Sequence, residues 1–185
     1  MALAPILLFS LFLHSFIGWR LASEVALFNP AFGTALWIAL ALSAVLMPMG
    51  MLARRIAKPP LSTALTWAGL LCMGLFSSLL VLTLLREILL VLGQLVDWLW
   101  PQAVALQALQ IDSAIALPAV ALLITVLGFW NARRTAAVVQ VDVPIANLPE
   151  ALQGFTVAQI SDIHVGPTIK THYLQRIVDR VNGLN

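Results

Sequence analysis

The residues with the most specific chemistry are an aspartate and a histidine, Asp162 and His164, two positions apart near the end of the chain. They lie where a predicted strand ends and a loop begins, ahead of a predicted helix. In open α/β architectures, ligands bind at that edge. A carboxylate oxygen beside an imidazole nitrogen suits a divalent transition metal ion such as Mn, Fe, Zn or Co. A bare Asp-x-His motif also recurs by chance in unrelated proteins, so on spacing alone the pair is one candidate metal site. The alternative for Asp162 is a structural role in capping the turn.

Three predicted elements must position this pair. Residues 137–143 (AVVQVDV) are rich in β-branched side chains that partly alternate with other types, and residues 155–160 (FTVAQI) form a second such run. Both are predicted strands. From about residue 170, apolar side chains follow helical spacing with one buried face. These side chains are Leu174, Ile177, Val178 and Val181. The last third of the chain therefore predicts the order β-β-α.

The chain as a whole has the composition of a membrane protein. Hydrophobic residues make up 61% of the sequence and charged residues 10%, and the mean hydropathy is +0.98. Ordinary soluble domains are roughly 45–50% apolar and about 25% charged. A globule of this size could not hide so much apolar surface from water, whereas a bilayer can. We therefore expect the lipid bilayer to be the main partner of this chain.

A membrane-spanning helix needs about 20 mostly apolar residues, and the sequence offers four such stretches. They are approximately residues 3–19, 32–52, 61–85 and 113–130. Between the third and the fourth, the apolar stretch after Arg86 either extends the third helix or forms a separate interfacial helix. The first stretch carries no positive charge before Arg20, unlike a secretory signal peptide, so we expect it to be retained.

The fold class that follows is a mainly α membrane bundle of about four transmembrane helices, followed by the first β-β-α elements of an α/β domain. The expected domains are residues 1–134, the transmembrane region, and residues 135–185, the part that faces water. The single cysteine, Cys72, lies within an apolar run and excludes an internal disulfide.

The basic residues predict how the bundle is oriented. They form short clusters that follow the second and fourth stretches, while the loops after the first and third carry mostly acidic groups. The clusters are Arg54, Arg55 and Lys58, then Arg133 and Arg134. The positive-inside rule places such clusters in the cytoplasm, so both termini are expected there in a multi-pass protein of the inner (plasma) membrane. The small net charge of +2 gives no reason to expect a nucleic-acid partner.

Several polar residues fall within the apolar stretches. For His14 we expect a neutral ring that hydrogen-bonds to a neighbouring helix. Arg86 and Glu87 are adjacent, so they do not face each other on a helix, and we expect Arg86 to extend to the lipid headgroups. Gly69 and Gly74 indicate close helix packing in the third stretch.

A wider set of motifs surrounds Asp162 and His164. It consists of Leu148-Pro149, residues 152–155 (LQGF), residues 160–168 (ISDIHVGPT) and Val181-Asn182. From about residue 138 onward the chain resembles the start of a metallophosphoesterase domain of the calcineurin-like family, in the branch fused to N-terminal membrane helices. The resemblance implies a two-sheet β-sandwich flanked by helices, an α/β metallophosphoesterase sandwich, in which Asp162 and His164 are the first ligands of a site for two divalent metal ions.

The resemblance also implies a function, and it implies that these residues are part of a longer protein. A membrane-anchored phosphoesterase would hydrolyse a phosphate ester or phosphoanhydride through a metal-activated water, and a phospholipid or a lipid-linked phosphate is a plausible substrate. The later ligand motifs of the family do not occur among these 185 residues. We therefore expect an N-terminal fragment that is inactive alone. The alternative is a non-catalytic helical membrane protein, a transporter or scaffold, with a degenerate phosphoesterase-like appendage.

Overall fold

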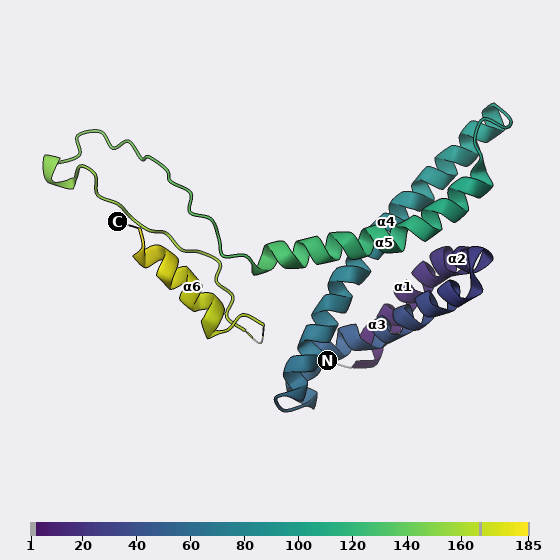
Figure 1. The fold of residues 1–185 in the computed structure, drawn as a ribbon, viewed down its shortest axis with the longest axis horizontal. Helices are drawn as coiled ribbons and strands as arrows, with labels where there is room; N and C mark the ends of the chain where they lie inside the picture. The colour runs from purple at the N-terminus through teal and green to yellow at the C-terminus, as the bar shows by residue number, and fades with distance from the viewer. Residues whose placement is uncertain (1–2, 167, 185) are drawn as a thin grey trace. The chain divides into compact units, whose positions relative to one another are not determined.

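A computed structural model describes residues 3–166 and 168–184 (Figure 1). The chain divides into two compact units, Met1–Ala132 and Arg133–Asn185. The described part of the first unit is built from helices joined by short connections. The described part of the second unit contains one α-helix and one short 3-10 turn.

Four stretches of helix in the first unit are long and apolar enough to cross a membrane. The first is made of α1 (Leu3–Ile17), a π-helical turn η1 (Gly18–Ala22) and α2 (Ser23–Phe28). The others are α3 (Pro30–Ile56), α4 (Leu61–Leu99) and α5 (Leu106–Arg133). The prediction of four membrane-spanning helices is thereby confirmed, by length and composition.

Two of these helices are longer than the sequence indicated. α4 continues through Arg86 without a break to Leu99, so the apolar stretch after Arg86 extends the same helix. At about 1.5 Å per residue, its 39 residues measure about 58 Å, against about 30 Å for the hydrocarbon core of a bilayer. The first stretch likewise continues beyond residue 19 to Phe28. The expected loop there is reduced to Asn29, because the charged residues Arg20 and Glu24 are paired within the bundle.

The turn between α2 and α3 shows why α3 starts where it does. Asn29 has an extended backbone conformation, and its side-chain oxygen accepts hydrogen bonds from the backbone N–H of Ala31 at 2.9 Å and of Phe32 at 3.4 Å. Asparagine is among the best N-cap residues because it satisfies these otherwise unpaired donors. Pro30 follows at the first helical position, where a missing N–H costs nothing.

α3 and α4 make the closest backbone contact in the bundle. A Cβ atom added at Gly50 would lie 2.6 Å from the Cα of Gly69, and one added at Gly69 would lie equally close to the Cα of Gly50. Small residues permit such an approach in membranes, where helices associate mainly by van der Waals packing. The close packing expected at Gly69 is confirmed. Gly74 makes an ordinary contact instead, with its ideal Cβ 3.6 Å from a methyl group of Thr125 on α5.

The outer surfaces of the bundle are apolar. Large hydrophobic side chains are exposed along every long helix, among them Phe12, Leu42, Leu89 and Leu123. In water such a surface would be unstable, but lipid chains solvate it. The exposure is therefore consistent with a bilayer around the helices.

In the second unit the helix expected from about residue 170 is present as α6 (Thr171–Asn182). The two predicted strands are not: residues 137–143 and 155–160 have no regular secondary structure. A strand requires a hydrogen-bonded neighbour, and neither segment has one among the described residues. Their apolar side chains stay open, with Val139 80% and Val157 79% exposed. The β-branched composition thus favours an extended backbone without producing a sheet here.

Candidate functional site

Asp162 and His164 lie in the irregular segment that precedes α6. The Oδ1 atom of Asp162 is 3.1 Å from Nε2 of His164, and the two side chains are 90% and 85% exposed. Asp162 adopts a positive φ of 64°, a conformation that aspartate tolerates better than most residues. The structure therefore brings the two predicted ligands together and leaves both of them accessible.

Hydrogen bonds to Arg133, at the start of the unit, hold the end of this segment and α6. The guanidinium of Arg133 donates a hydrogen bond to the carbonyl of Thr168 at 3.0 Å, and Arg176 on α6 donates to the carbonyl of Arg133 at 3.3 Å. The backbone N–H of Gly166 donates to the carbonyl of Ile169 at 3.0 Å. These bonds hold the end of the loop near α6, while the side chains of Asp162 and His164 stay exposed.

The geometry of the pair fits a shared metal ion. Nitrogen and oxygen ligands lie about 2.0–2.2 Å from a transition metal, so two of them at roughly a right angle are about 3 Å apart. The observed 3.1 Å between the carboxylate oxygen and the imidazole nitrogen is compatible with this separation, and it is also the length of the hydrogen bond that the two side chains make with each other. Chemically, the donors are also of the types that Mn, Fe, Zn and Co accept.

The rest of a metal centre is not found in the described residues. No group of three or more His, Cys, Asp or Glu side chains that could hold a metal occurs in residues 3–166 and 168–184. His172 is exposed in the first turn of α6, and His14 belongs to the helical unit. Asp162 and His164 therefore have no third candidate ligand beside them among the described residues. Their role as metal ligands remains a prediction.

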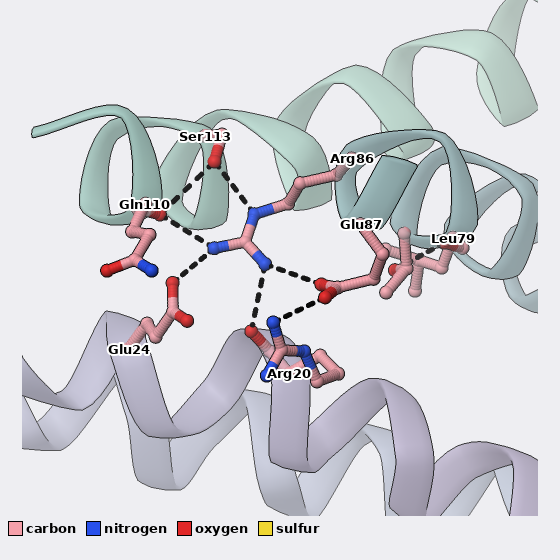
Figure 2. Close-up of polar contacts among 8 residues, drawn as sticks. Arg20, Glu24, Leu79, Arg86, Glu87, Gln110 and Ser113 are labelled. Atoms are coloured by element: carbon pink, nitrogen blue, oxygen red, sulfur yellow. Dashed lines mark hydrogen bonds and ion pairs between the residues drawn. The ribbon is translucent and has the colours of Figure 1, made fainter. Parts of the chain in front are cut away.

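A second polar site, within the membrane helices, escaped the sequence analysis. Figure 2 shows Arg86 of α4 at the centre of a network that reaches η1, α2 and α5. Its members, which we call the Arg86 network, are Arg20, Glu24, Arg86, Glu87, Gln110 and Ser113. Two positive and two negative side chains are present, so the network is neutral as a whole.

The guanidinium of Arg86 has a partner for each of its five N–H donors. Nε donates to the Ser113 hydroxyl at 2.7 Å, and Nη2 donates to the Gln110 carbonyl at 2.8 Å and to the Glu24 carboxylate. Nη1 donates to Glu87 Oε1 at 2.9 Å and to the Arg20 carbonyl at 3.4 Å. The side chain of Arg86 is 2% exposed. Arginine presents its donors in a fixed fork, which suits such complete pairing.

This arrangement corrects two expectations. Arg86 does not extend to the headgroups; it points into the bundle, because carboxylates and carbonyls there replace the hydration that the charge would otherwise lose. Arg86 and Glu87 also do pair, although adjacent residues diverge on a helix, because both side chains bend toward Arg20. The signal that could have revealed the site was the pair of opposite charges that closely follows each of two apolar stretches, Arg20 with Glu24 and Arg86 with Glu87.

His14 forms a smaller polar cluster between α1 and α3. Its Nδ1 donates to the carbonyl of Ser10 at 2.8 Å, since a carbonyl only accepts, and in that tautomer Nε2 accepts from the hydroxyl of Ser43 at 3.0 Å. The ring stacks on Phe76 of α4 with centroids 4.3 Å apart. The hydrogen bond to a neighbouring helix that we expected for His14 is confirmed, and the cluster satisfies itself without a ligand.

Comparison with known proteins bears on the predicted function. No protein-family model matches the chain, and no solved structure matches it. Two curated proteins do. One, from Danio rerio, is 47% identical over 62 residues, which is 34% of this chain and 14% of that protein. The other, from Bos taurus, is 37% identical over 71 residues, which is 36% of this chain and 16% of that protein.

Both relatives carry the name transmembrane protein with metallophosphoesterase domain. The matched region thus spans less than a fifth of either relative's own length. The four apolar helices agree with the first half of that name. Over about a third of its length this chain is similar to transmembrane proteins with a metallophosphoesterase domain, as its motifs predicted.

Proposed function

We propose that the chain belongs to a membrane-anchored, metal-dependent phosphoesterase and that Asp162 and His164 supply the first ligands of its metal centre. The observation that carries the proposal is the convergence of these two side chains, 3.1 Å apart and open to solvent, in a chain similar to proteins named for a metallophosphoesterase domain. The relatives' names apply to those proteins, and the activity of this one is our proposal.

In such a centre, two divalent ions would polarise a phosphoryl oxygen and provide a nucleophilic hydroxide from bound water. Asp162 would contribute an anionic oxygen and His164 a neutral nitrogen. Asp162 has a left-handed backbone, and its carboxylate already lies 3.1 Å from the His164 ring. Two protein ligands do not hold two ions, so we predict that residues 1–185 on their own do not hydrolyse phosphoesters.

The proposal includes a fold for the second unit. We propose that residues 137–143 and 155–160 become neighbouring strands of a two-sheet sandwich when further strands pair with them. Their β-branched side chains favour strands. The high exposure of Val139 and Val157 leaves an apolar surface that such a sheet would bury.

The proposal also includes a place in the cell. Basic clusters lie at the C-terminal ends of α3 and α5. By the positive-inside rule these ends face the cytoplasm, so we propose that the helices span the inner (plasma) membrane and that the second unit is cytoplasmic. A site on that side would lie near lipid headgroups. We propose a phospholipid or a lipid-linked phosphate as the substrate, in accord with the surface that the anchor provides.

The test is hydrolysis of bis(p-nitrophenyl) phosphate by the complete protein, translated from its whole reading frame and purified in detergent. Activity should depend on added Mn²⁺ and fall by about 100-fold or more in Asp162→Asn and in His164→Gln, because each loses a metal ligand. Asp142→Asn changes another exposed aspartate of the same unit and should retain full activity. Unchanged activity in Asp162→Asn would refute the assignment.

The Arg86 network favours one alternative, a helical membrane protein with a degenerate phosphoesterase-like appendage. Charged groups inside membrane helices are costly and often functional, so the bundle need not be a passive anchor. The codons that follow Asn185 distinguish the two functions. A frame that encodes further Asp, Asn and His ligands supports the phosphoesterase, whereas a frame without them supports the alternative.

A further inference from the structure

We propose that Arg86 is a membrane-buried latch that docks α5, the helix that leads into the second unit, onto the rest of the bundle. Arg86 lies on α4 and bonds in two directions. Toward α5 it donates to Ser113 and to the Gln110 carbonyl, and toward η1 and α2 it donates to the Arg20 carbonyl and Glu24 (Figure 2). One side chain therefore joins three separate membrane-spanning stretches.

The latch lies inside the part of α4 that faces lipid. Arg86 is 13 residues from the end of α4 at Leu99, or about 20 Å along the axis. The intervening turns expose large apolar side chains, including Ile88, Val91 and Leu95, which is typical of contact with acyl chains. The Arg86 side chain is 2% exposed, so separation of α5 would leave its donors to Ser113 and the Gln110 carbonyl without partners.

α5 also makes apolar contacts, such as the edge-to-face contact of the Phe129 ring with Trp67 of α4 and the packing of Leu117 against the core. Of its residues, only Ala114 and Ala121 are buried, and both side chains are small. α4 and α5 are in contact in one antiparallel register, with Arg86 opposite Ser113 and Gly74 opposite Thr125. A helix with so little buried apolar surface depends strongly on each specific bond, and Arg86 supplies two of them.

The consequence concerns the second unit. α5 ends at Arg133, the residue at which the second unit begins, and residues 135–145 follow without regular secondary structure. The docking of α5 therefore determines where the chain leaves the bundle. The inference about Arg86 is independent of the phosphoesterase proposal, since it depends on the helices alone.

Disulfide trapping in the full chain tests the latch. Cys72 is the single native cysteine, so Cys72→Ala gives a background free of thiols. Gly74→Cys and Thr125→Cys then report on α5, because the ideal Cβ of Gly74 lies 3.6 Å from Cγ2 of Thr125, a γ position that the sulfur of a cysteine at residue 125 can occupy, within reach of a cysteine at residue 74. Oxidation with copper–phenanthroline in detergent is followed by maleimide labelling and mass measurement of the remaining thiols.

The parent pair should form its disulfide rapidly. Arg86→Leu should slow this reaction by about tenfold, because it removes both bonds to α5 and leaves the Glu24 carboxylate without its partner, while Glu87 keeps Arg20. Ser113→Ala removes one hydrogen bond and should slow it by about threefold. Leu89→Ala, a change at a neighbouring side chain of α4 that is 61% exposed, should match the parent.

The milder variant keeps the test decisive if Arg86→Leu does not fold, as judged by helical circular dichroism and gel filtration. In that case Ser113→Ala alone decides. Cross-linking at the parent rate in Ser113→Ala, or in a folded Arg86→Leu, would overturn the latch. Failure of the parent pair to cross-link would overturn the register on which the latch depends.

Discussion

The contact between Gly50 and Gly69 makes a sharp prediction about the bundle. In Gly69→Ala the added methyl group would lie 2.6 Å from the Gly50 Cα, 2.8 Å from the Leu46 carbonyl oxygen and 3.1 Å from the Gly50 nitrogen. All three are backbone atoms, so no side-chain rotation relieves the clash. α3 and α4 must move apart instead.

The size of the effect follows from these distances. Carbon atoms in contact lie about 3.5–4.0 Å apart, so the helices must separate by about 1 Å at this point. Overpacking of this kind costs about 1–3 kcal/mol. Replacement of glycine by alanine also stabilises a helix by about 1 kcal/mol. A control variant with the same replacement but no clash is therefore needed to measure the free energy of the clash alone.

Gly128→Ala provides the matched control. Gly128 lies in a membrane helix, α5, and a Cβ atom there would meet nothing within 4 Å. We expect Gly69→Ala to be less stable than Gly128→Ala by about 2 kcal/mol, or about 4–8 °C in the midpoint of thermal unfolding. The assay is tryptophan fluorescence of the detergent-solubilised full chain during heating. Equal midpoints for the two variants would refute the close approach of α3 and α4.

Three further predictions concern the rest of the chain. Asn29→Ala should lower the free energy of unfolding by about 1 kcal/mol through loss of the α3 cap; an unchanged thermal midpoint would contradict the cap. Ser43→Ala should cost about 1–2 kcal/mol in the same assay because it leaves His14 Nε2 without a donor, and a neutral effect would count against that bond. In spheroplasts, a membrane-impermeant maleimide should label Ala103→Cys, between α4 and α5, and spare Ala136→Cys in the second unit, in a Cys72→Ala background; the reverse pattern would invert the proposed orientation.

Much of the helical unit could be predicted from the sequence, because membrane helices follow from apolar length alone. The ends of the helices could not. The third helix reads as if it ends at Arg86 and the first as if it ends before Arg20, since a charge normally marks the limit of the hydrocarbon. In the structure these two residues and their acidic partners neutralise one another, so both helices continue past them.

At the candidate site the two residues could be predicted from the sequence, but the elements around them could not. The types and spacing of Asp162 and His164 predicted that they converge, and they do. The two strands that were predicted before Asp162 are not formed, because pairing depends on partners that a local pattern does not specify. The Arg86 network was missed for the same reason: its members come from three stretches of sequence, and only the packing of the helices joins them.

Metal binding at Asp162 is the most direct test of the central claim. Mn²⁺ added to the complete protein can be counted by the electron paramagnetic resonance signal of the free ion, in the parent, in Asp162→Ala and in the control Asp142→Ala. We predict that the parent and the control bind two ions per chain, and that Asp162→Ala weakens binding by about 100-fold or more. Binding in Asp162→Ala with the stoichiometry and affinity of the parent would contradict the account.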